Sequence, residues 1–247
     1  MLLKQAAATM RKMTADQTLP VLVLMPGLDG TGKLFAEFVR VLSPTVECVV
    51  VSYPKDQPMG YGELEGLLVS ALPKDRPFVL LGESFSGPLA IRVAARAPVG
   101  LMGLILCVTF AKNPYPSLGW ARRLAAYLPV KGLPRWVRAP LMWGSVSPSS
   151  APSQVERAMS GVSAAVVRKR ISELLAVDET AALRQIRIPI LVLRAVGDRV
   201  VSKRATQVIL KNSPEAKLVE IDGPHLLLQT RAAECAAVVV NFLGALN

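Results

Sequence analysis

Short apolar segments alternate along this chain with segments of helical periodicity, and this alternation limits the folds open to it. The apolar runs predict strands, because they are short, rich in branched residues and bounded by turn residues. Parallel strands joined by helices form a sheet that is covered on both faces. The sequence therefore predicts an α/β fold with a mostly parallel sheet and helices on both faces. The expected strands are 21–25, 46–51, 78–81, 101–108, 190–195 and 217–221, and the expected helices are 33–42, 61–72, 86–97, 202–211 and 226–246.

The alternation stops between residues 111 and 178, where seven prolines interrupt short helical pieces. We interpret this segment as a helical cap inserted into the fold. It could lie over the carboxyl edge of the sheet, where proteins with such sheets bind their ligands. The predicted division is an N-terminal tail at 1–18, a core at 19–110 and 179–247, and the cap insertion at 111–178.

The composition places the chain among globular proteins. It has 247 residues, 51% of them hydrophobic, which is enough to bury a large core. The longest apolar run, Leu101 to Ala111, is about half as long as a membrane-spanning helix. The first 19 residues lack the apolar region of a secretory signal. We therefore expect a cytoplasmic protein without a transmembrane segment.

The net charge of +11 allows several kinds of anionic partner. The longest basic run, Arg168-Lys169-Arg170, has no interleaved aromatic residues, which argues against nucleic acid. A weak attraction to anionic surfaces is compatible with the charge. The single histidine and three widely spaced cysteines offer no metal site, and no cofactor is implied.

A serine at a predicted strand-to-helix turn is the strongest chemical signal. Ser84 lies in the string Gly82-Glu83-Ser84-Phe85-Ser86-Gly87. A nucleophile elbow exposes its serine on a turn so sharp that the residues two before and two after it must be small. Gly82 and Ser86 meet this requirement, although Ser86 stands where glycine is usual. Ser84 is therefore the predicted nucleophile, and a helix-capping role is the alternative.

A serine hydroxyl needs a base, and His225 is the only histidine that the chain offers. It follows the last expected strand, so it should lie at the same edge as Ser84. The base needs an orienting carboxylate, and Asp198 follows the preceding strand. The order serine, aspartate, histidine is the one expected for such a site. Asp222 and Glu83 are weaker candidates because of their positions in the two loops.

The loop Pro26 to Gly32 follows the first expected strand and could complete an oxyanion hole. The expected donors are the backbone N–H groups of Leu28 and of Phe85, the residue after the nucleophile. The string Gly27 to Lys33 also has the spacing of a phosphate-binding loop. The next residue is Leu34 rather than the serine or threonine that binds magnesium, which argues against a nucleotide site.

Taken together, these motifs resemble the α/β-hydrolase superfamily. The resemblance covers the chain from about Leu19 to its end and implies the α/β-hydrolase fold with an inserted cap. The early loop begins Pro26-Gly27 where His-Gly is usual, and its form resembles a branch of esterases, lipases and thioesterases that includes acyltransferases. The resemblance implies a serine hydrolase that cleaves carboxylic esters through an acyl-enzyme intermediate. A thioesterase, an acyltransferase and a non-catalytic ligand-binding member of the fold are the alternatives.

The cap segment contains all three tryptophans of the chain, and ten basic residues against three acidic ones. Aromatic side chains bury large apolar areas and commonly line pockets for small ligands. We therefore predict that an apolar acyl group binds against Trp120, Trp136, Trp143 and Tyr127, with a cationic rim that includes the run 168–170. The alternative is that the aromatic residues only pack the cap on the sheet and that the charges are solvated.

A cationic rim predicts a salt effect that depends on the substrate. The kcat/KM for an anionic acyl donor should fall as ionic strength rises, whereas that for a neutral ester should stay constant, because salt screens exposed charges. Steady-state kinetics with both donors over a salt series measures the effect. The same salt dependence for both donors would remove the rim and leave only an apolar pocket.

Overall fold

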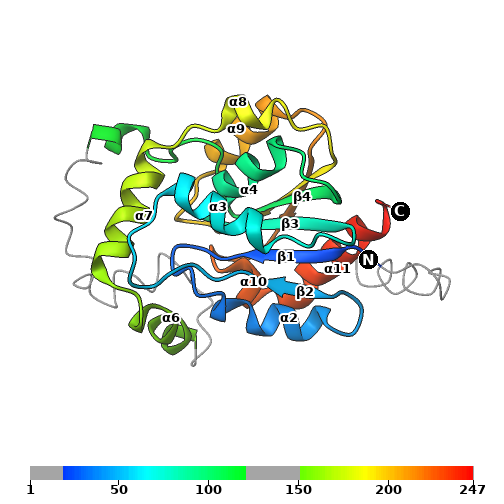
Figure 1. Cartoon of the computed structure of the whole chain (residues 1–247), viewed down its shortest axis with the longest axis horizontal. Coiled ribbons are helices and arrows are strands. Elements are labelled where there is room, and N and C mark those ends of the chain that lie inside the picture. Colours follow the sequence, from blue (N-terminus) through cyan, green and yellow to red (C-terminus); the bar gives the residue numbers. More distant parts are fainter. Residues whose placement is uncertain (1–18, 121–150, 247) are drawn as a thin grey trace.

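A computed structural model describes residues 19–120 and 151–246. In these ranges the strands β1 to β6 form one sheet in the order β2-β1-β3-β4-β5-β6, and every neighbouring pair is parallel. The predicted parallel α/β architecture is thereby confirmed (Figure 1). The strands are β1 Val21–Met25, β2 Cys48–Val50, β3 Phe78–Glu83, β4 Leu101–Cys107, β5 Ile190–Ala195 and β6 Lys217–Ile221.

Helices cover both faces of the sheet, as the alternation predicts (Figure 1). One face carries α3, α4, α8 and α9, and the other carries α2, α10 and α11. The helices are η1 Lys33–Phe35, α2 Ala36–Leu42, α3 Tyr61–Ala71, α4 Ser86–Ala95, α6 Ala151–Ser160, α7 Ala164–Ala176, α8 Thr180–Leu183, α9 Lys203–Asn212, α10 Leu227–Thr230 and α11 Ala232–Gly244.

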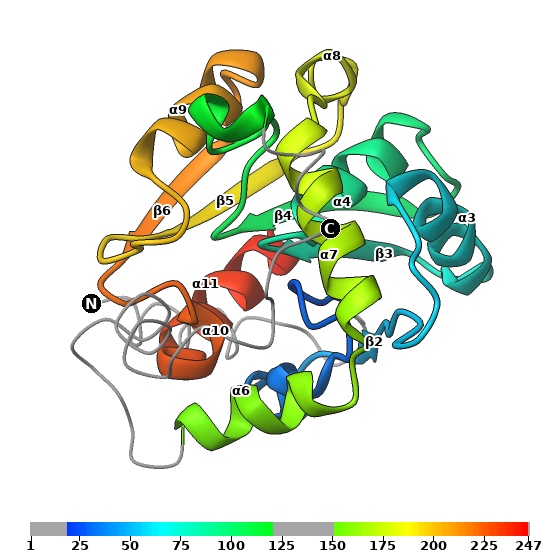
Figure 2. The same ribbon diagram turned by 90° about the vertical axis from the view of Figure 1, so that its left-hand side faces the viewer.

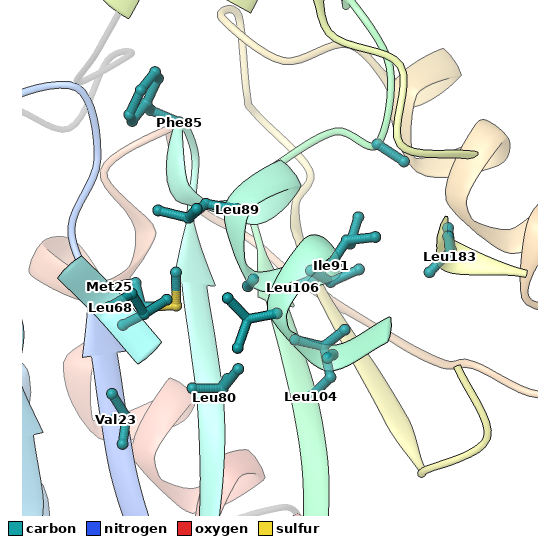
Figure 3. Packing of buried hydrophobic residues seen from close by; sticks show 14 of the residues in the cluster. Val23, Met25, Leu68, Leu80, Phe85, Leu89, Ile91, Leu104, Leu106 and Leu183 are labelled. Carbon is teal, nitrogen blue, oxygen red and sulfur yellow. The ribbon is translucent and has the colours of Figure 1, made fainter. Parts of the chain in front are cut away.

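Successive side chains of each strand pack into opposite apolar layers. In β1, Val21, Val23 and Met25 join one buried cluster, whereas Leu22 and Leu24 join the other. The inner strands are buried on both faces, which explains why their sequences read as continuous apolar runs rather than as alternating ones. Figure 3 shows the first layer, where Leu89 and Ile91 of α4 meet Leu80 of β3 and Leu104 and Leu106 of β4.

The sheet reverses its direction of winding between β1 and β3. From β1 the chain moves outward to β2, then crosses back to β3 and continues to β6. The loops after β1 and β3 therefore leave neighbouring strands on their way to opposite faces. Such a switch point opens a crevice at the carboxyl ends of the strands. The elbow at Ser84 and the loop from Pro26 to Gly32 both lie there.

Two predicted helices differ from the structure in their detail. The segment 33–42 begins as the 3-10 turn η1 and becomes α-helical only at Ala36. The segment 226–246 was predicted as one helix, which is wrong, because it is broken at Arg231 into α10 and α11. Arg231 has φ −128° and ψ 39°, outside the helical region, and its side chain donates to the Asp222 carbonyl at 2.7 Å.

The predicted cap segment joins the core through two chain stretches that lie side by side. Asn113 donates its backbone N–H to Val177 at 2.8 Å, and Glu179 donates to Ala111 at 2.7 Å. The described part beyond this neck contains α6 and α7, which lie past the carboxyl ends of the strands (Figures 1 and 2). The division of the chain into core and cap stays a prediction.

The first turn of α4 lies unusually close to the strands. A Cβ atom on Gly82 would come within 2.8 Å of the Ser86 carbonyl oxygen and of the Ala90 Cβ. A Cβ atom on Gly87 would overlap the Thr109 side chain, which follows β4. Glycine at both positions therefore allows the helix to start directly on the sheet.

This close approach predicts opposite effects for two glycine-to-alanine substitutions. Gly87→Ala should lower the free energy of unfolding by about 1–3 kcal/mol, because the new methyl group must displace Thr109. Gly62→Ala, in α3, has no atom within 4 Å of its new Cβ and should raise stability by about 0.5–1 kcal/mol. Urea denaturation of both variants measures the difference. Equal effects of the two substitutions would contradict the close packing of α4.

Candidate active site

Ser84 occupies a tight turn between β3 and α4. Its backbone is in the left-handed region with φ 51°, where non-glycine residues are uncommon. The end of β4 and the residues after it hold this turn. The Ser84 N–H donates to the Cys107 carbonyl at 3.0 Å, and the Thr109 hydroxyl donates to the Ser84 carbonyl. Val108, between these partners, is also left-handed, with φ 43°. This strained arrangement presents the half-buried Ser84 side chain at the carboxyl edge of the sheet.

The structure brings Ser84, His225 and Asp198 into one hydrogen-bonded row. The Ser84 Oγ lies 3.0 Å from His225 Nε2, and His225 Nδ1 lies 2.8 Å from Asp198 Oδ2. His225 is 5% exposed, so the imidazole is shielded from water. A carboxylate can only accept, so Nδ1 carries the proton and Nε2 is left to accept from the serine hydroxyl. This geometry suits removal of a proton from Ser84.

Asp198 is fixed by the backbone that follows it. Its Oδ1 atom accepts the N–H groups of Val200 at 2.7 Å and Val201 at 2.8 Å, which leaves Oδ2 for His225. Asp222 and Glu83, the weaker candidates for the orienting carboxylate, have different surroundings. The Asp222 side chain is exposed, and Glu83 accepts a hydrogen bond from Gln229.

The loop after β1 wraps back toward the elbow. Gly30 and Gly32 have φ values of 67° and 70°, and the Gly30 carbonyl accepts the Tyr53 N–H at 2.7 Å. Within the described residues, no partner is found for the backbone N–H of Leu28 or Phe85, the two predicted oxyanion donors. The buried Asp29 carboxylate accepts from the Thr31 N–H and hydroxyl. A buried acidic side chain in this loop disfavours a phosphate ligand.

Ser86 explains how the elbow tolerates a residue other than glycine. Its side chain is fully buried, and its hydroxyl donates to the Pro26 carbonyl and lies 2.7 Å from the Tyr53 hydroxyl. Ser86 thus joins the elbow to the loop after β1. Neither this role nor that of Tyr53 was predicted, because their partners lie 33 and 60 residues away in sequence.

Glu83 is a buried carboxyl group beside Ser84. The Gln229 side-chain amide donates to its Oε1 atom at 3.0 Å. Burial raises the pKa of Glu83 to about 7, while the hydrogen bond from Gln229 acts in the opposite direction. The group is therefore partly protonated at neutral pH, and its charge next to the site varies with pH.

The aromatic residues of the predicted pocket are only partly placed. Trp120 is 70% exposed, whereas Trp136, Trp143 and Tyr127 lie outside the described residues. Arg170 was predicted to belong to an exposed cationic rim, which is wrong, because its side chain is 1% exposed. It lies on the apolar side of α7, next in the helical repeat to Val166, Val167 and Leu174, and this pattern could have revealed its burial.

Two further features of the described residues bear on function. Helices in the ranges 19–120 and 151–246 are too short or too polar to cross a membrane. No group of three or more histidine, cysteine, aspartate or glutamate side chains in those ranges is arranged to hold a metal ion.

A serine, a histidine and an aspartate at the switch point of a parallel sheet place this protein in the class of α/β proteins with the α/β-hydrolase fold. The model of the alpha/beta hydrolase family matches residues 22–238. The chain belongs to this family.

Two curated proteins and one solved structure show what the chain is similar to. The chain is 25% identical over 251 residues to polyketide synthase ThaQ of Burkholderia thailandensis, covering 91% of this chain and 12% of that protein. It is 34% identical over 91 residues to thioesterase TesA of Mycobacterium marinum, covering 32% of this chain and 36% of that protein. The alignments thus span well under two thirds of either relative. Among solved structures, the enol-lactonase from Burkholderia xenovorans has a TM-score of 0.76 at 20% identity, with 93% of each chain covered.

The raised pKa of Glu83 predicts how stability depends on pH. Between the ordinary value of 4.5 and about 7, the folded protein binds this proton more tightly than the unfolded chain does. The contribution of Glu83 to the free energy of unfolding therefore falls as pH rises through this window. The side chain of Glu83→Gln resembles the protonated form of Glu83. The free energy of unfolding of this variant should therefore rise relative to that of the wild type as the pH rises from 5 to 8. Urea denaturation across that range measures this, and a pH-independent difference would show that Glu83 is ionised throughout.

Proposed function

We propose that this protein is a serine hydrolase that cleaves carboxylic esters of apolar acyl groups, with Ser84 as nucleophile, His225 as base and Asp198 as orienting carboxylate. One observation carries the proposal. The hydrogen-bonded row from Ser84 through His225 to Asp198 starts at a strained turn, and the chain belongs to a family of hydrolases. The proposed substrate is a small acyl ester.

The first half of the reaction forms an acyl-enzyme. The Ser84 Oγ attacks the acyl carbon while His225 Nε2 takes the hydroxyl proton. Asp198 holds the imidazole in this tautomer and stabilises the imidazolium that forms. The carbonyl oxygen becomes an oxyanion, which the backbone N–H groups of Leu28 and Phe85 would bind. The intermediate then collapses, the bond to the leaving alcohol breaks, and the alcohol takes the proton from His225.

The second half releases the acyl group. A water molecule gives one proton to His225 Nε2, and its oxygen attacks the acyl carbon. The bond to Ser84 Oγ then breaks, and the proton returns to Ser84 to regenerate the hydroxyl. Preorganised N–H donors such as those of Leu28 and Phe85 act in both halves, because both pass through an oxyanion.

A thioester is the second candidate substrate. The resemblance to thioesterase TesA favours it, although the matched region covers 32% of this chain. The same row of residues suits both substrates, since the attack on the carbonyl carbon is the same and only the leaving group changes from an alcohol to a thiol. An acyltransferase would replace the water by an alcohol.

Reaction with a fluorophosphonate tests the nucleophile, because such probes label activated serines. Labelling should be abolished in Ser84→Ala. It should be retained in Ser86→Ala, because the Ser86 hydroxyl of the wild type donates to a backbone carbonyl. Gel fluorescence of the two variants beside the wild type measures this. Loss of labelling in Ser86→Ala alone would move the nucleophile to Ser86.

Hydrolysis of p-nitrophenyl esters and acyl-coenzyme A thioesters of graded chain length extends the same test to the substrate. The wild type should prefer longer acyl chains, and Ser84→Ala should lose roughly ten-thousand-fold or more in kcat. Turnover by the wild type that persists in Ser84→Ala would refute the proposed function.

A further inference from the structure

Arg170 is a buried cation whose hydrogen bonds, within the described residues, go to backbone carbonyls. It lies on α7 and has the largest side chain among the fully buried residues of the described ranges. Its Nη1 atom donates to the carbonyls of Leu28 at 2.9 Å and Asp29 at 2.8 Å, and its Nη2 atom donates to Pro54 at 3.0 Å. Burying a charge is costly unless its donors are satisfied, and here three carbonyls accept hydrogen bonds from three of the five N–H groups.

The loop after β1 is shaped around this guanidinium group. Gly30 has φ 67°, and a Cβ atom at that position would overlap the Arg170 guanidinium. The Tyr53 ring lies 5.6 Å from the Arg170 Cζ atom, within the range of a cation–π interaction. An apolar side chain could fill the same space but would leave three carbonyls without these donors, so packing alone does not account for an arginine here.

The same loop is held at its other end by the elbow. The Ser86 hydroxyl donates to the Pro26 carbonyl and lies 2.7 Å from the Tyr53 hydroxyl. Between these two attachments lies the peptide that carries the Leu28 N–H. Ser86 therefore fixes the loop from the elbow, and Arg170 fixes it from α7.

We propose that Arg170 is a positioning residue that sets the Leu28 backbone N–H in place as an oxyanion donor and makes this donor depend on the seating of α7. The inference rests on the proposed function, because it assumes that Leu28 binds an oxyanion. Arg170 binds the carbonyl of Leu28 itself and of the next residue. A shift of about 1 Å in such a donor costs up to roughly a hundred-fold in rate.

Other contacts seat α7 against the core. Glu173 accepts the Tyr61 N–H at 3.1 Å at the start of α3, and the Ser163 side chain caps α7 by accepting from the Val166 N–H at 3.2 Å. Val162, Val166 and Val167 form a buried cluster against which Leu28 packs. Removal of the Arg170 guanidinium should therefore leave α7 in place and take away only its hydrogen bonds to the carbonyls of Leu28, Asp29 and Pro54.

Paired oxoester and thionoester substrates test this role. In the thionoester, sulfur replaces the carbonyl oxygen. Sulfur accepts hydrogen bonds weakly, so hydrolysis of the thionoester gains little from the N–H donors. Arg170→Met should lower kcat/KM for the oxoester by roughly ten-fold or more and should lower the oxoester-to-thionoester ratio. Arg170→Lys should give a smaller decrease, because its ammonium group can still donate to a carbonyl but cannot span all three. The matched control is Arg76→Met, which removes an exposed arginine paired with Glu47, and it should keep the wild-type ratio.

Thermal unfolding of each variant, followed by circular dichroism, shows whether the variant folds. If Arg170→Met does not fold, Arg170→Lys decides, since lysine keeps the charge and much of the apolar stem. A folded Arg170 variant with the wild-type ratio would overturn the role of Arg170 and leave the proposed function intact. Absence of Ser84-dependent turnover in the wild type would instead refute the proposed function.

Discussion

The close contact between the start of α4 and the ends of β3 and β4 is the constraint on which the site depends. Ser84 can occupy its left-handed conformation only because Gly82 and Gly87 let the helix begin directly on the sheet. Thr109 fills the space that a side chain on Gly87 would need, and its hydroxyl binds the Ser84 carbonyl. The strain at Ser84 is thus balanced by packing and hydrogen bonds from the neighbouring strand. A rigid scaffold of this kind holds a nucleophile better than a mobile loop would.

The strands and the order of Ser84, Asp198 and His225 could be predicted from the sequence, because both depend on patterns among residues that are close together in the chain. Buried parallel strands give apolar runs, and the predicted bounds of β5 and β6 agree with the structure. Ser84, Asp198 and His225 each follow a predicted strand, so the topology alone brings them to one edge, and the structure places them within hydrogen-bonding distance. Their catalytic roles stay predictions.

Contacts between distant segments could not be predicted in this way. The bond from Arg170 to Leu28 joins residues 142 positions apart, and that from Gln229 to Glu83 joins residues 146 positions apart. In sequence, Arg170 is the end of a basic run, and a basic run usually lies on a solvated face. Its burial follows from the rotation of α7, which turns Arg168 and Arg170 to different sides of the helix. Charge counted along the chain therefore overestimates the charge that the cap can present to a substrate.

The topology also explains how α7 comes to contact the loop after β1. Because the winding reverses between β1 and β3, the loop after β1 and the elbow after β3 lie side by side at the carboxyl edge. The segment that contains α7 connects β4 to β5 and leaves the sheet at that same edge. One short loop, Pro26 to Gly30, thus contacts the elbow through Ser86 and α7 through Arg170. In this arrangement a displacement of α7 would reach the proposed oxyanion donor through the Arg170 guanidinium group and through the packing of Leu28 on α7, without any change in Ser84, His225 or Asp198.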